Sequence, residues 1–172
     1  MASTPQSPAA APSPEAVHVE ETHVGLYQVV IHAGGATFLG DEPRDAGGLG
    51  SGPNPYELLG AALGACTAMT VRSYAQRKGW PLAHVRVRVA HVRATLEARD
   101  RFEREVSFEG DLDETQLARL EAIANRCPVH QTLERGADVR TTVVPRGETA
   151  LEASSGQHVR DMNEACGEEA AA

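Results

Sequence analysis

An uncharged stretch in the middle of the chain constrains the fold more than any other feature. Residues 58–71 contain no Asp, Glu, Lys or Arg, and they lie inside the segment 55–79, which has helix signals at both ends. Asn54 is a favoured N-cap, Pro55 suits the first helical position and Gly79 ends the helix. The run is too short to span a bilayer, which needs about 20 apolar residues. A helix without a polar face is normally buried, so we predict a central core helix.

Cys66 lies near the middle of this predicted helix, and small side chains precede it. These small residues are Gly60, Ala61, Ala62, Gly64 and Ala65. With so little side-chain bulk, other backbones can pack closely against the helix. The helix is also more apolar than one small sheet can cover, so we expect a second copy of the chain on its other face. The sequence therefore predicts an obligate homodimer with a reachable thiol at its centre.

The composition excludes several classes of partner. The 172-residue chain carries a net charge of −8, which argues against nucleic acid and against anionic membrane surfaces. Aromatic residues form 4% of the chain, too few for a platform on which bases stack. Three cysteines are too few for a disulfide-built scaffold. No apolar targeting segment opens the sequence, so we expect a cytoplasmic protein.

The remaining patterns predict an α+β fold with largely antiparallel pairing. The predicted elements are strands at 17–22, 26–33 and 36–39, the central helix, a hairpin of strands at 85–94 and 102–109, a helix from 113 to about 127, and a strand at 139–143. Residues 1–16 and the acidic tail 145–172 are polar, and we expect both to be disordered. One domain at 17–144 remains.

Two of the three cysteines are candidates for chemistry. Cys66 is either an inert buried residue or a nucleophilic thiolate, whose pKa a nearby cation or hydrogen-bond donor would have to lower. Cys127 is either a packing residue at a helix end or a second reactive thiol. Pro128 should end the second helix at Cys127, and the negative end of a helix disfavours a thiolate, so Cys127 suits a resolving role. Cys166 lies in the acidic tail and is expected to be incidental.

No cofactor site is recognisable in the sequence. Cys127 and His130 could share an ion with Cys66, but no Cys-x-x-Cys motif or second ligand pair accompanies them, as structural zinc sites require. The glycine-rich phosphate loops and the nucleophile elbow of hydrolases are absent as well. We therefore expect thiol chemistry without a cofactor.

Several separated motifs resemble the OsmC/Ohr family of osmotically inducible and organic-hydroperoxide-resistance proteins. They are Asp41-Glu42-Pro43, Gly52-Pro53-Asn54-Pro55-Tyr56-Glu57-Leu58-Leu59, Ala65-Cys66-Thr67 and Cys127-Pro128-Val129-His130. The resemblance covers residues 17–144. It implies an OsmC-like fold, an intertwined homodimer in which mostly antiparallel sheets wrap around paired central helices, with two-cysteine active sites at the dimer interface. It also implies reduction of organic hydroperoxides, and in some members of hydrogen peroxide.

The resemblance implies a role for each cysteine. Cys66 matches the peroxidatic cysteine, whose thiolate attacks the peroxide, releases an alcohol and becomes a sulfenic acid. Cys127 matches the resolving cysteine, which condenses with that sulfenic acid to form a disulfide. An external dithiol of the lipoyl or thioredoxin type then restores both thiols. No metal, flavin or haem is required.

The family also implies an acid and a cation that activate the thiol. At the position of the family's glutamate this chain has Tyr56, and the adjacent Glu57 is the candidate acid, acting within the chain or across the dimer. Arg44 is the nearest candidate for the arginine, and Arg126 is an alternative. Two other functions stay open: a non-enzymatic dimer that binds a small apolar ligand or a thiol metabolite, and hydrolase or acyl-transfer chemistry through Cys66.

Overall fold

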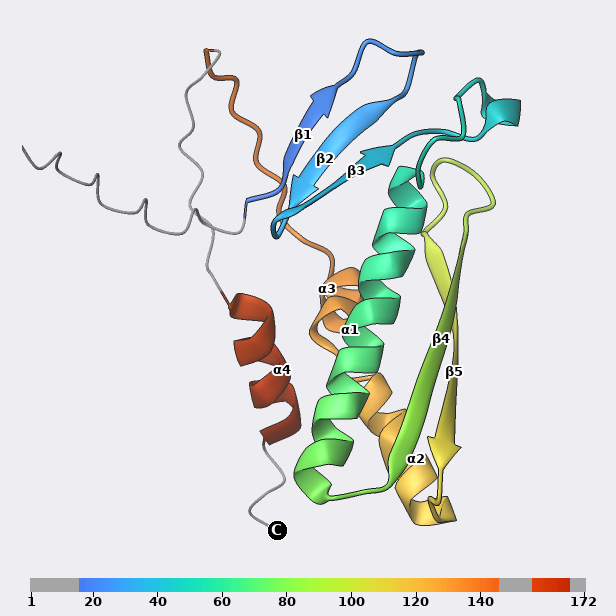
Figure 1. Ribbon diagram of the computed structural model, residues 1–172, viewed down its shortest axis with the longest axis vertical. Coiled ribbons are helices and arrows are strands. Elements are labelled where there is room, and N and C mark those ends of the chain that lie inside the picture. The colour runs from blue at the N-terminus through green and yellow to red at the C-terminus, as the bar shows by residue number, and fades with distance from the viewer. Residues whose placement is uncertain (1–15, 146–155, 168–172) are drawn as a thin grey trace, which may run out of the picture.

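The computed structural model describes residues 16–145 and 156–167 (Figure 1). Its elements are β1 (His18–Glu21), β2 (Val29–Ala33), β3 (Ala36–Gly40), the short 3-10 helix η1 (Arg44–Ala46), α1 (Pro55–Lys78), β4 (Leu82–Val92), β5 (Arg101–Gly110), α2 (Glu114–Ala124), α3 (Pro128–Arg135) and α4 (Gln157–Gly167). One sheet has the order β1-β2-β3, and β4 pairs with β5 in the other. All pairings are antiparallel, which confirms the predicted α+β class.

The N-terminal sheet and the loop after it lead the chain into α1. Gly34 and Gly35 both have positive φ, 56° and 81°, which glycine adopts without strain, and they make the two-residue turn between β2 and β3. After β3, the buried carboxylate of Asp41 accepts hydrogen bonds from the backbone N–H groups of Leu49 and Ser51. These bonds fix the glycine-rich loop that positions the start of α1.

Helix α1 forms the axis of the molecule and has the predicted ends. The Asn54 side chain accepts from the Glu57 N–H at 2.9 Å, and the Glu57 carboxylate accepts from the Asn54 N–H at 2.8 Å. Gly79 ends the helix in the left-handed conformation. In the single chain, Leu59 and Met69 are 43% and 54% exposed, on the part of the helix for which the sequence predicts cover from a second copy of the chain. The buried residues are Leu63, Cys66, Thr67, Thr70, Val71, Tyr74 and Ala75.

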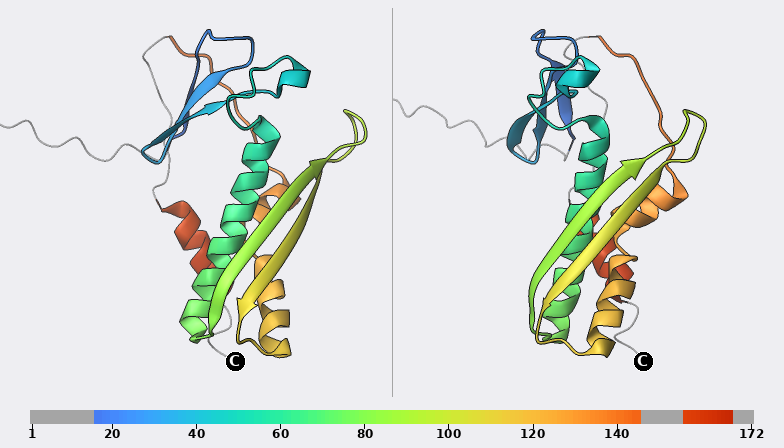
Figure 2. Two further views of the ribbon diagram at one scale, coloured as in Figure 1. Left: turned by 45° about the vertical axis from the view of Figure 1, so that its right-hand side comes forward. Right: turned by 90° about the vertical axis from the view of Figure 1, so that its right-hand side faces the viewer.

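The β4–β5 hairpin crosses one side of α1 (Figure 2). Gly60 and Gly64 face this hairpin, and a Cβ atom at either position would lie 3.6 Å from the Val89 side chain. Small residues therefore let β4 approach the helix backbone closely. On the outer face of the hairpin, Arg88 and Glu105 pair across the strands at 3.7 Å.

Helices α2 and α3 close the core beside α1. A capping box joins Asp113 and Gln116 at the start of α2. This helix ends at Ala124 rather than near Cys127, and Pro128 begins a separate helix, α3. The main buried cluster contains Val71, Tyr74, Ala75, Leu82, Leu120, Ile123, Ala124 and Cys166.

The acidic tail is not disordered throughout, which corrects the prediction for 145–172. Residues 157–167 form α4, whose Met162 and Cys166 are buried, at 9% and 7% exposure. These two side chains and His158 recur every four residues, so they share one face of the helix. The polar composition of the tail hides this apolar face. Residues 146–155 and 168–172 lie outside the described residues, as does most of the predicted disordered segment 1–16.

The predicted strand at 139–143 is also wrong. Residues 136–145 have no regular secondary structure, and Val139 and Val143 are 88% and 95% exposed. Neither sheet of the described residues includes this segment. Its alternating pattern is compatible with a strand, but a strand forms only where another strand takes up its backbone hydrogen bonds.

Candidate active site

The structure brings Cys66 and Cys127 together in a small buried cluster. Cys66 comes from the middle of α1, and Cys127 lies in the link between α2 and α3. Their exposed fractions are 2% and 0%, and the two thiols are hydrogen-bonded to each other. The apolar residues around them are Leu63, Val89, Phe102, Val129 and Leu133.

The N-terminus of α3 points at both sulfur atoms. The Val129 N–H donates to Cys66 Sγ at 3.4 Å, and the His130 N–H donates to Cys127 Sγ at 3.3 Å. Cys127 is itself the N-cap of α3. A helix N-terminus stabilises negative charge. The prediction that Cys127 lies at the negative end of a helix is therefore wrong, because Pro128 starts a new helix at that point.

Arg104 supplies the cation beside this pair. Its Nη1 donates to Thr67 Oγ1 at 2.8 Å and to the Ala124 carbonyl at 3.1 Å, and it lies 4.0 Å from Cys127 Sγ. Its Nη2 donates to Asn125 Oδ1 at 2.7 Å. These bonds hold the guanidinium in place, so its charge acts on Cys127 at a fixed distance.

The two thiols divide one proton unequally. The hydrogen bond from Cys66 lowers the pKa of Cys127 to about 5, against the effect of burial and with help from Thr67, the His130 N–H and Arg104. The same bond and burial raise the pKa of Cys66. The surroundings therefore favour the negative charge of the pair on Cys127 over Cys66.

His158 of α4 contacts Cys66 from the other side. Its Nε2 atom lies 3.2 Å from Cys66 Sγ, within reach of a hydrogen bond. The sequence does not point to this residue, because it lies in the tail that is predicted to be disordered. Among residues 16–145 and 156–167, no group of three or more His, Cys, Asp or Glu side chains is arranged to hold a metal ion.

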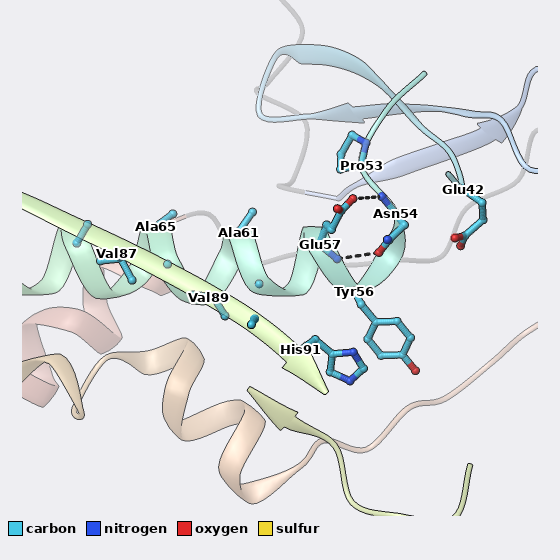
Figure 3. Close-up of a pocket in the computed structure, with 14 residues that line it drawn as sticks. Glu42, Pro53, Asn54, Tyr56, Glu57, Ala61, Ala65, Val87, Val89 and His91 are labelled. Carbon is cyan, nitrogen blue, oxygen red and sulfur yellow. Dashed lines mark hydrogen bonds between the residues drawn. The ribbon is translucent and has the colours of Figure 1, made fainter. Parts of the chain in front are cut away.

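Within the single chain, Glu57 and Arg44 are not brought to the cysteine pair. Glu57 takes part in the capping box of α1 and lines a groove of about 1010 Å³ between that helix and β4 (Figure 3). Tyr56 and His91 stack in the same groove, with ring centroids 4.0 Å apart. Arg44 lies in the exposed helix η1, in the loop between β3 and α1 and away from α3 (Figure 1).

A signal in the sequence could have identified Arg104. In β5, Phe102, Val106 and Phe108 alternate with outward-facing polar residues, and Arg104 occupies the inward register between them. A charged side chain on the apolar face of a strand requires polar partners inside the fold. Here those partners are Thr67 and the link that carries Cys127.

Comparisons with known proteins identify the fold. Residues 48–142 match the family model of OsmC-like proteins. An OsmC-like protein from Mycoplasma pneumoniae superposes with a TM-score of 0.59 at 17% identity, over 72% of this chain and 89% of that one. An organic hydroperoxide resistance protein, OsmC, from Legionella pneumophila superposes with a TM-score of 0.53 at 21% identity, over 72% and 90%. At these identities the likeness establishes the fold.

Two further findings bound the interpretation. No curated protein matches the sequence. Across the described ranges, 16–145 and 156–167, none of the helices is long and apolar enough to cross a membrane.

Proposed function

Because the chain belongs to the OsmC-like protein family, we propose that it is a cysteine-dependent peroxidase that reduces organic hydroperoxides. One observation carries the proposal: two buried thiols share a hydrogen bond at the N-terminus of α3, with a fixed guanidinium beside them. A pair in which one sulfur is already ionised is suited to forming a disulfide after the other is oxidised. The protein from Legionella pneumophila, an organic hydroperoxide resistance protein, supports this choice of substrate.

In the proposed reaction Cys66 attacks the peroxide and Cys127 resolves the product. A Cys66 thiolate attacks the terminal oxygen of R–O–O–H, the O–O bond breaks, and an alcohol leaves after protonation of the alkoxide. The Cys127 thiolate then attacks the Cys66 sulfenic acid and displaces hydroxide to give the disulfide. Sulfur is oxidised by two electrons, and the peroxide is reduced by two.

The electrostatics of the pair support this division of roles. A thiolate of low pKa is a weak nucleophile but a good leaving group. Because the pKa of Cys127 is about 5, this thiol does not have to lose a proton before it attacks the sulfenic acid. When an external dithiol of the lipoyl or thioredoxin type attacks the sulfur of Cys66, Cys127 departs readily. No cofactor enters the cycle.

The surroundings of the pair favour an organic substrate. The side chains of Val89, Phe102, Val129 and Leu133 pack against Cys66 and Cys127. An apolar peroxide loses little by leaving water for such surroundings, whereas a very polar one loses its hydration. The proposed site therefore discriminates in favour of peroxides with an apolar group.

A second copy of the chain is part of the proposal. The exposed face of α1 carries Leu59 and Met69, and neither sheet covers it. A homodimer through this face would bury those side chains and bring a partner's Glu57 or Arg44 toward the site. The groove of Figure 3, which is separate from the cysteine pair, supports the alternative that the dimer binds a small ligand without turning it over.

Intact-mass measurement after one equivalent of cumene hydroperoxide tests the proposal. Wild-type protein should lose two hydrogens as an internal disulfide, whereas Cys127→Ser should gain oxygen at Cys66, and Cys66→Ser should not consume peroxide. Cys166 is the internal control, because it lies in another cluster, and it should stay unmodified in all three proteins. Oxidation at Cys127 with Cys66 untouched would reverse the roles. An absence of reaction at both would refute the peroxidase and favour the ligand-binding dimer.

A further inference from the structure

Helix α4 carries a residue of the site that the proposed reaction has not used. His158, Met162 and Cys166 occupy successive turns of one face of this helix. Met162 and Cys166 are buried, and Asn163 accepts a hydrogen bond from Arg77 of α1 at 3.0 Å. These contacts dock α4 on α1 and determine where its first turn lies.

The docking places an imidazole against the thiol that lacks a base. His158 Nε2 lies 3.2 Å from Cys66 Sγ, and the ring is half-buried. Besides Cys127, the neighbours of that sulfur are the Val129 N–H, which can only donate, and Thr70 Oγ1 at 4.0 Å. Cys127 already carries the negative charge of the pair. Removal of the proton from Cys66 without a neighbouring base would leave two adjacent thiolates, and like charges at this distance repel strongly.

We propose that His158 is a catalytic residue of this chain: it takes the proton from Cys66 and returns it to the departing alkoxide. This role rests on the proposed peroxidase function. A histidine ring exchanges a proton near neutral pH, and the imidazolium formed would offset the second negative sulfur. Paired cysteine and histidine side chains activate thiols in the same way in other enzymes.

The step balances in atoms and electrons. His158 Nε2 accepts the Cys66 proton, which leaves a thiolate and an imidazolium. The thiolate forms an S–O bond to the terminal peroxide oxygen, and the electron pair of the broken O–O bond leaves on the alkoxide. The imidazolium protonates that alkoxide to the alcohol and becomes neutral again. Cys66 is then a sulfenic acid, ready for attack by Cys127.

Alkylation of Cys66 by iodoacetamide, followed by peptide mass spectrometry, tests the pair without peroxide. In full-length His158→Gln, the rate at residue 66 at neutral pH should fall at least about tenfold, and the rate of oxidation by cumene hydroperoxide should fall by about 10². His84→Gln is the matched control, because His84 is an exposed histidine in β4, and both rates should equal those of wild type. Equal rates in the two variants would overturn the proposal.

A second measurement uses wild-type protein, so it does not depend on the folding of a variant. Alkylation replaces the Cys66 thiol beside His158 Nε2 with a thioether that has no proton to give, so the nitrogen resonance of that ring should shift. An unchanged resonance would overturn the contact and the proposal with it. If the rate of Cys66 alkylation depends on His158 but wild-type protein does not consume peroxide, the thiol–imidazole pair is supported and the peroxidase function is refuted.

Discussion

Replacement of Arg104 by methionine tests the electrostatics of the cysteine pair. The guanidinium lies 4.0 Å from Cys127 Sγ, and an opposite charge at such a distance lowers the pKa of an acid by about 1–3 units. Arg104 shares the lowering of the Cys127 pKa with hydrogen bonds from Cys66, Thr67 and the His130 N–H. Its removal should therefore raise that pKa by about 1 unit, at the lower end of this range.

The same substitution should reduce stability. Arg104 donates to Thr67, Ala124 and Asn125, and methionine leaves those three acceptors without a donor. The side chain is half-buried, so water replaces part of the loss, and we expect a cost of about 1–3 kcal/mol. For a chain of this size that corresponds to a fall in Tm of roughly 3–9 °C.

The ultraviolet absorbance of the thiolate, titrated from acid to neutral pH, measures the pKa directly. Cys127→Ser supplies the baseline, and the midpoint of wild type should lie near 5. Arg88→Met is the control, because Arg88 pairs with Glu105 on the exposed face of the same hairpin, and its midpoint should match wild type. Arg104→Lys keeps the positive charge but lacks the planar guanidinium, so its midpoint should lie between those of wild type and Arg104→Met. A folded Arg104→Met protein with an unchanged midpoint would refute the role assigned to Arg104.

Three other predictions follow from the fold and the site. Folding lowers the pKa of Cys127, so its thiolate contributes its full stabilisation above the unfolded pKa of about 8.5 and loses it as the pH falls through about 5. The difference in the free energy of unfolding between wild type and Cys127→Ser should therefore shrink as the pH falls from about 8.5 to about 5. A difference that stays constant would contradict the lowered pKa. Deletion of 146–172 should cost about 2–4 kcal/mol, because Met162 and Cys166 leave the core, whereas deletion of 168–172 should not lower the Tm. Sedimentation at low micromolar concentration should show a dimer, and a well-folded monomer would contradict the proposed interface.

The two ends of α1 and the start of α2 were predictable because their signals are local. Asn54, Glu57 and Gly79 lie next to the ends that they fix, so their residue types alone determine what they do there. The capping box of α2 follows the same rule. The pairing of the cysteines was predictable only through the family resemblance, since the two residues come from different elements of the chain.

The errors concern contacts between distant segments. The segment 139–143 has a strand pattern, but a pattern does not supply the neighbouring strand that it needs. Helix α4 has an apolar face that is not visible in the overall composition of the tail, and its stability depends on the core cluster that receives Cys166. His158 could not be predicted for the same reason: it lies in a tail of polar composition, and nothing in that composition places it near a buried thiol.

The N-terminus of α3 explains why the two thiols must differ. Its N–H groups reach both sulfur atoms, yet two adjacent negative charges repel, so one thiolate forms at the expense of the other. The choice then depends on the remaining neighbours. Arg104 and Thr67, held by β5 and α1, favour the charge on Cys127. On the other side, His158 gives Cys66 a route to ionisation that does not compete with Cys127. The resolving thiolate can therefore persist while the attacking one forms only as its proton leaves.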